Sequence, residues 1–175
     1  MILTTDAILK GPIWAEVLER LVGPVFKTYW DVYALSISIG MMHDRQIEAE
    51  KMVPDGYDAE PRSVPRTVLG HPHNKALLEF MLQAAMVTTK HLELTEDERL
   101  GIAFDAEQKP SFNPIVFLTK YANYGVTQIK DAIEDADGVE LLVALMSLLN
   151  GTYEAGFTVM GEELTEEELA LIDDE

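Results

Sequence analysis

Two histidines, His71 and His73, are separated by a single proline and form the pattern in this sequence most typical of metal chemistry. Imidazole nitrogens spaced in this way can hold Zn²⁺ or Mn²⁺ when a third ligand lies near, and His91 or a carboxylate could supply it. The pair lies in a proline-rich loop, where exposed histidines without a metal are common. A small metal-dependent enzyme built on this loop is one hypothesis, and a surface histidine pair is the other.

The same loop carries a small basic cluster that includes Arg62 and Arg66, and no acidic residue lies between positions 61 and 75. Guanidinium groups bind phosphate or carboxylate groups through paired hydrogen bonds. The cluster is too small to fill a nucleic-acid groove by itself. We therefore expect Arg62 and Arg66 to contact a partner protein, or else to belong to a loop that only caps helix ends.

Other reaction chemistries have no local support in the sequence. Cysteine is absent, which excludes thiol catalysis, disulfides and cysteine-bound zinc. No serine lies in a Gly-x-Ser-x-Gly motif, and neither common glycine-rich phosphate-binding motif occurs. We accordingly predict a protein without a cofactor and without enzymatic activity.

The net charge of −18 is distributed unevenly along the chain. Lys130 is the last basic residue, and fourteen of the 31 acidic residues follow it. Such an end should repel nucleic acid and attract a basic protein surface, although a solubilising tail has the same composition. The side chains expected to bind the partner are Glu162, Glu163, Glu166, Glu167, Asp173 and Asp174.

Helical spacing of apolar residues dominates the elements that must position these groups. The stretch VFKTYWDVYALSISIGMMHDR (25–45) is aromatic and apolar on more than half of a helix circumference, so it predicts a buried helix. The stretch VELLVALMSLLN (139–150) is apolar nearly all round and predicts the central helix, ended by Asn150-Gly151. Residues 53–72 contain several prolines and glycines and predict an irregular loop.

Helix-capping residues indicate where the remaining helices begin and end. They predict helix starts at Pro12, Asn74, Thr95 with Glu98, and Asn113-Pro114, and helix stops at Gly101 and Gly125.

No hairpin is convincing, so we predict an all-α fold: a compact single-domain bundle of about six or seven helices. The expected division is a helical domain over residues 1–150 and an acidic C-terminal extension over 151–175 with one short helix. No secretory signal is visible, and no apolar run approaches the roughly 20 residues of a membrane span. These features favour a cytoplasmic location.

Two stretches resemble a known family. VFKTYWDVYALSISIG (25–40) is similar to the opening helix of the DNA phosphorothioation-associated protein 4 family, and LTKYANYGVTQIKD (118–131) resembles its later Tyr-Ala-Asn signature. ALLEFMLQAA (76–85) occupies the place of the family's middle helix, so the resemblance spans about residues 25–135. Tyr124 stands where the family usually has a glycine. The resemblance implies an accessory subunit of an anti-phage defence or DNA-modification system, and it implies no catalytic residues.

These observations lead to one leading hypothesis and two alternatives. The leading one is a non-enzymatic accessory subunit whose acidic face binds a larger protein with a basic surface, such as an ATPase, nuclease or helicase. The first alternative is an acidic DNA mimic that inhibits a DNA-binding enzyme, and the second is the metal-dependent enzyme around His71 and His73. We expect no direct binding to nucleic acid or membrane, and leave pairing with a second copy of the chain open.

Overall fold

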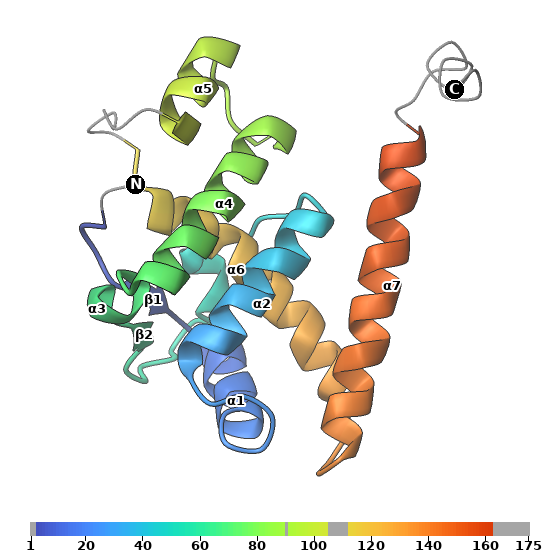
Figure 1. The fold of residues 1–175 in the computed structure, drawn as a ribbon. Coiled ribbons are helices and arrows are strands. Elements are labelled where there is room, and N and C mark those ends of the chain that lie inside the picture. Colours follow the sequence, from blue (N-terminus) through green and yellow to red (C-terminus); the bar gives the residue numbers. More distant parts are fainter. Residues whose placement is uncertain (1–2, 90, 105–111, 163–175) are drawn as a thin grey trace.

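In a computed structural model the chain forms a mostly helical domain (Figure 1), and residues 3–89, 91–104 and 112–162 are described, with side-chain burial given through residue 153. The elements follow in the order β1 (Ala7–Leu9), α1 (Pro12–Leu21), α2 (Tyr29–Met42), the 3-10 helix η1 (Ala49–Met52), β2 (Arg62–Val64), α3 (Arg66–Leu69), α4 (Pro72–Thr88), α5 (Glu96–Phe104), α6 (Pro114–Ile133) and α7 (Glu140–Glu162). Seven α-helices thus occur within the described residues. The predicted all-α class and helix number are confirmed.

Helix α6 is the centre of the domain. Asn113 caps it by accepting hydrogen bonds from the backbone amides of Ile115 and Val116, and Pro114 occupies its first position, as predicted. Its buried residues recur over its whole length, and it packs against α1, α2, α7 and β1. The predicted stop at Gly125 is wrong, because the helix continues to Ile133.

Gly125 instead allows α2 and α6 to approach closely. A Cβ atom at Gly125 would collide with the carbonyl oxygen of Ser36, and one at Gly40 would collide with that of Tyr121. The two glycines therefore lie on facing helices at one crossing, where each meets the backbone of the other helix. The helix predicted within residues 25–45 is confirmed as core, since α2 buries Trp30, Tyr33 and Ile37 among others.

Buried hydrogen bonds fix the register of the helices around α6. The indole Nε1 of Trp14 donates to Oδ1 of Asn123 over 2.9 Å, and Nδ2 of Asn123 donates to the carbonyl of Ile47 over 3.0 Å. The hydroxyls of Tyr33 and Thr119 lie 2.9 Å apart between α2 and α6. Buried polar groups are costly unless paired, so these contacts specify one arrangement of the core.

The proline-rich segment is more regular than its composition predicts. β2 pairs antiparallel with β1 in the register Ala7 with Val64, Ile8 with Ser63 and Leu9 with Arg62. This two-stranded sheet was not predicted, and it is not a hairpin, because more than fifty residues separate its strands. The short helix α3 follows, and α4 begins at Pro72 rather than after Asn74, whose side chain donates to the carbonyl of Val68. β2 was missed because the prolines and glycines around it predict a loop and because its partner strand lies over fifty positions earlier.

At α5 the capping box of Thr95 and Glu98 is confirmed, because each side chain bonds the backbone amide of the other. Gly101 does not end the helix, which continues to Phe104. None of the helices in the described ranges is long and apolar enough to cross a membrane.

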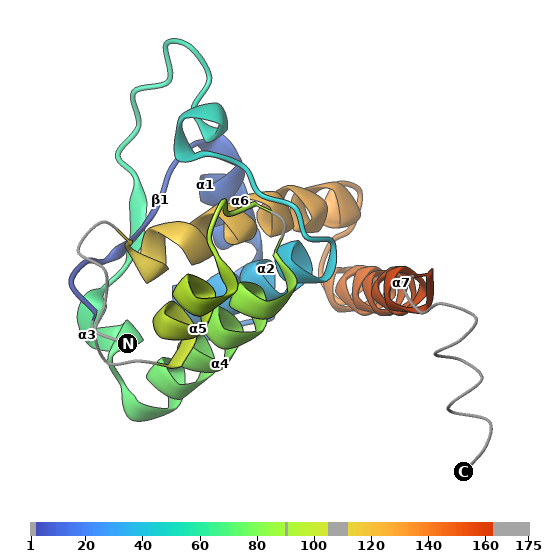
Figure 2. The ribbon, with the colours of Figure 1, turned by 90° about the horizontal axis from the view of Figure 1, so that it is seen from above.

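Helix α7 lies at the edge of the domain, and the prediction that residues 139–150 form the central helix is wrong. Figures 1 and 2 show α7 on one side, against α2 and α6 only at its lower part. The helix also passes through Asn150-Gly151 and the expected domain boundary at residue 150, ending at Glu162. Arg20 on α1 binds the segment just before α7. Its guanidinium donates to the carbonyl of Ala136 over 2.5 Å and lies 3.8 Å from the Asp137 carboxylate.

Candidate functional site

The predicted basic residues and histidines lie together along one stretch of surface. Arg62 is on β2, Arg66 opens α3, His71 precedes α4 and His73 lies in its first turn, and all four side chains are exposed. The backbone amide of Arg66 donates to Asp6 Oδ1 over 2.7 Å, which fixes this stretch to the N-terminal strand.

The histidine pair has no third metal ligand within the part of the chain that the structure describes. No group of three or more His, Asp or Glu side chains there could hold a metal ion. His91, the expected third ligand, instead donates from Nε2 to the carbonyl of Asp44 over 2.7 Å. The described residues therefore give no geometric support to the metal-enzyme alternative.

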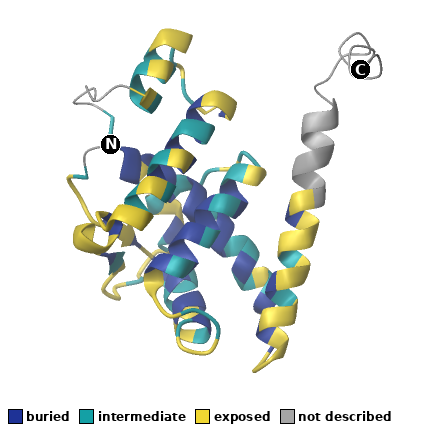
Figure 3. Cartoon of the chain, viewed as in Figure 1, coloured by how far each residue is buried: buried dark blue, intermediate teal, exposed yellow. Residues whose placement is uncertain are grey.

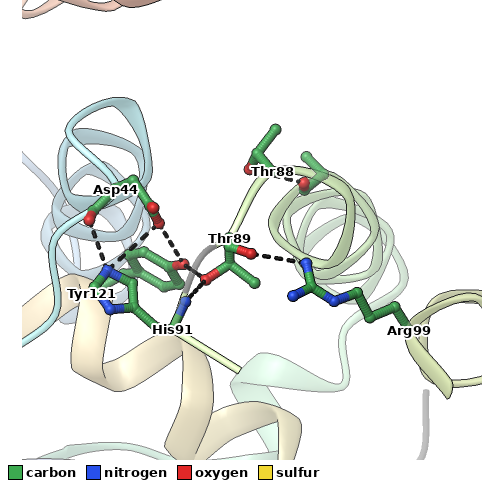
Figure 4. Close-up of polar contacts among 7 residues, drawn as sticks. Asp44, Thr88, Thr89, His91, Arg99 and Tyr121 are labelled. Carbon is green, nitrogen blue, oxygen red and sulfur yellow. Dashed lines mark hydrogen bonds and ion pairs between the residues drawn. The ribbon is translucent and has the colours of Figure 1, made fainter. Parts of the chain in front are cut away.

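His91 belongs to a polar cluster that the sequence did not reveal (Figure 4). Asp44 follows α2 with a φ of 42°, a left-handed conformation that aspartate tolerates better than most residues. The Tyr121 hydroxyl on α6 lies 3.0 Å from Asp44 Oδ1 and 2.7 Å from Thr89 Oγ1. Arg99 on α5 donates to the Thr89 carbonyl over 2.7 Å. The cluster joins the ends of α2 and α4 to α5 and α6.

This cluster has the properties of a structural junction. Burial raises the pKa of the Tyr121 hydroxyl to about 12, which keeps it a neutral hydrogen-bond donor at physiological pH. The Arg99 guanidinium also donates to the Leu92 carbonyl over 2.9 Å, so it closes the loop between α4 and α5. The polar groups of the cluster are hydrogen-bonded to one another and to backbone carbonyls of the chain itself.

The described surface includes two hollows of a few hundred Å³. One, of about 400 Å³, lies between α4 and α5 and is lined by apolar residues with Glu96 and Arg99. The other, of about 340 Å³, lies between β1, η1 and α6. Its Lys120 and Glu48 are paired at 2.7 Å, and the Thr119 hydroxyl donates to the Ile115 carbonyl over 2.7 Å. These polar groups are therefore already engaged within the protein.

The predicted acidic residues fall at the far end of α7 and beyond it. Glu162 is the last residue of the helix, and its side chain is outside the described set. Glu163, Glu166, Glu167, Asp173 and Asp174 lie outside the described residues altogether. Both views place α3, which follows Arg62, across the domain from α7 (Figures 1 and 2), so the basic stretch and α7 are separate features.

The most exposed apolar surface of the described chain lies on α7 and the residue before it. Exposed residues are frequent along the lower part of α7 (Figure 3). Six large apolar side chains are exposed there: Val139 by 84%, Leu142 by 54%, Val143 by 66%, Met146 by 57%, Leu149 by 40% and Tyr153 by 65%. Together they present on the order of several hundred Å² of surface, the size at which patches on monomers mark interaction sites. We therefore take α7 as the candidate site, of the protein-docking class.

The sequence pattern correctly indicated that α7 is apolar on most sides, but the inference that it is the central helix was wrong. Leu141 and Leu145 are buried against the domain, whereas Leu142 and Met146 one position later are exposed. An all-round apolar helix predicts burial on every side. The described residues bury only one side of α7 between Glu140 and Tyr153, so the signal of a second contact was present in the pattern.

Comparisons of this chain with protein-family models, with curated proteins and with solved structures each found no match.

Proposed function

We propose that this protein is a non-enzymatic accessory subunit whose acidic C-terminal end docks on a basic surface of a larger protein. The observation that carries the proposal is α7, which begins just after the segment that Arg20 binds, belongs to the base-free part of the chain, and runs along the side of the domain opposite α3 (Figure 1). A helix of 23 residues spans about 35 Å, so this end extends far past its attachment.

The basic side chains of the domain support this reading, because several are already engaged there. Lys120 pairs with Glu48 at 2.7 Å, and Lys130 pairs with Glu134 at 2.9 Å. Arg20 and Arg99 bind backbone carbonyls through their guanidinium groups. Since residues 131–175 contain no lysine or arginine, positive charge on another molecule would complement them.

The setting we propose is a prokaryotic anti-phage defence or DNA-modification complex in the cytoplasm. It rests on the resemblance of residues 25–135 to the phosphorothioation-associated family. The partner would be the complex's ATPase, nuclease or helicase, since such enzymes carry the basic surfaces that bind DNA. The accessory subunit would either occupy that basic surface or keep it correctly positioned.

Affinity purification from the native host tests the proposal. The test variant changes Glu162, Glu163, Glu166, Glu167, Asp173 and Asp174 to their amides. The control variant changes six exposed acids of the domain in the same way: Glu19, Glu50, Asp55, Asp58, Glu60 and Glu93. Both variants lose the same charge.

We expect a partner to copurify with the wild type and the control, and to be lost from the test variant and at high salt. Retention of the partner by the test variant, or equal loss from both variants, would show that the acidic end is not the docking surface.

A further inference from the structure

The exposed residues of α7 follow the spacing of a helix-pairing seam. Leu142, Met146, Leu149 and Tyr153, here called the outer row, are separated by four, three and four residues. This alternation is that of the a and d positions of a heptad, which align along one side of a helix. An outer row of large apolar side chains in this register is suited to a second helix, which fills it with knobs-into-holes packing.

The outer row is distinct from the side that holds α7 to its own domain. Leu141, Leu145 and Thr152 form the buried side, which faces α2 and α6. With 3.6 residues per turn, the outer row is turned from this side by about a quarter of the circumference. A second helix can therefore lie along the outer row while the contact with α2 and α6 stays intact.

The composition of the outer row favours an identical helix as the occupant. No charged residue occurs from Leu141 to Tyr153, so this part of α7 offers nothing that selects a partner of opposite charge. Two copies of the same helix are complementary in an isologous pair, the commonest arrangement of homodimers. After Glu140 the next acidic residue is Glu154, and acidic residues become frequent again only from Glu162 onward, beyond the outer row.

The same charges decide the direction of the two helices. A parallel pair would bring two ends without a single basic residue side by side. An antiparallel pair places them at opposite ends, with the two Glu162 positions separated by about 44 Å, several times the roughly 8 Å screening length at physiological salt. We propose that α7 pairs antiparallel with α7 of a second copy of this chain.

The heptad positions set the register of this pair. In antiparallel helices the a positions face d positions, so Met146 lies opposite Leu149 of the second copy, and Leu142 lies opposite its Tyr153. The two-fold axis then passes between Ser147 and Leu148. Both acidic ends remain outside the paired segment, so the pairing does not depend on the docking function proposed above.

Analytical ultracentrifugation of the full chain tests the pairing. We expect the wild type to have twice the mass of one chain, and Met146→Glu to have the mass of one chain. Ser147→Glu is the matched control, because Ser147 is the exposed next residue and lies outside the outer row. The control should remain dimeric, and unchanged circular dichroism of both variants shows that the domain stays folded.

A monomeric wild type at the highest concentration reached, or equal effects of the two substitutions, overturns the proposal. A monomeric wild type would indicate that the outer row binds a different protein. Amide replacement of the six terminal acids leaves the dimer unchanged if the pairing is as described, so loss of partner docking and loss of pairing are separate results.

Cysteine cross-linking tests the direction, since the chain has no cysteine of its own. Oxidation of mixed Leu142→Cys and Tyr153→Cys proteins should give a cross-linked dimer containing both variants. Each variant oxidised alone should stay un-crosslinked. Efficient cross-linking of each variant with itself would show a parallel pair and overturn the antiparallel arrangement.

Discussion

Tyr121 connects packing and polarity at the level of single residues. Its ring lies in the core against Phe117, with ring centroids 5.4 Å apart, while its hydroxyl reaches Asp44 and Thr89. Burial raises its pKa to about 12 and also raises the pKa of Tyr33, which is fully buried. Ionising either phenol inside the domain is therefore unfavourable.

This shift predicts alkaline instability. A folded pKa above the unfolded value of 10.0 contributes stability that is fully present below pH 10 and is lost as the pH rises toward 12. Urea unfolding at increasing pH should show stability falling across this range. Tyr121→Phe should weaken that pH dependence, and at neutral pH it should cost about 1–2 kcal/mol through the lost hydrogen bonds. An unchanged alkaline profile in the variant would contradict the assignment.

At the scale of elements, the crossing of α2 and α6 has a strict steric requirement. Gly125→Ala should destabilise the fold by at least about 1–3 kcal/mol, because the new methyl group meets the backbone of Ser36. Gly151→Ala in α7 is the matched control. Nothing lies within 4 Å of its Cβ position, so better helix propensity should raise stability by up to about 1 kcal/mol. Denaturation midpoints followed by circular dichroism measure both, and equal effects would contradict the close approach.

The attachment of α7 gives a second prediction at this scale. Arg20→Met removes the hydrogen bonds to the carbonyls of Glu134 and Ala136 while keeping much of the side-chain volume. We expect faster amide hydrogen exchange in residues 140–153 and a loss of about 1–2 kcal/mol. Glu16→Gln, which removes only the ion pair with Arg20 at 3.8 Å, should change exchange little.

Sequence patterns predicted the elements better than their placement. Local signals identified Asn113-Pro114 and Thr95 with Glu98, because caps depend on neighbours along the chain. Gly125 was read as a stop because its role depends on Ser36, nearly ninety positions away. The cluster of Asp44, Thr89 and Tyr121 was invisible for the same reason, since its members meet only in the folded chain.

At the scale of the whole molecule, net charge opposes compactness. With 31 acidic and 13 basic residues, the folded chain repels itself, and salt screens that repulsion. Thermal melting in increasing sodium chloride should therefore show a rising midpoint, and the variant with six terminal amides should show a smaller rise. A midpoint that falls with salt would indicate that ion pairs such as Lys120 with Glu48 outweigh the repulsion.

The far end of α7 has one further consequence. Its last turn contains no basic residue, so α7 itself supplies no cation there to complement the negative pole of the helix macrodipole. A polyamine such as spermine, mimicking a cationic protein surface, should neutralise this pole and increase the helical circular dichroism signal. Binding to a basic surface and helix formation in the last turn of α7 would then be thermodynamically coupled.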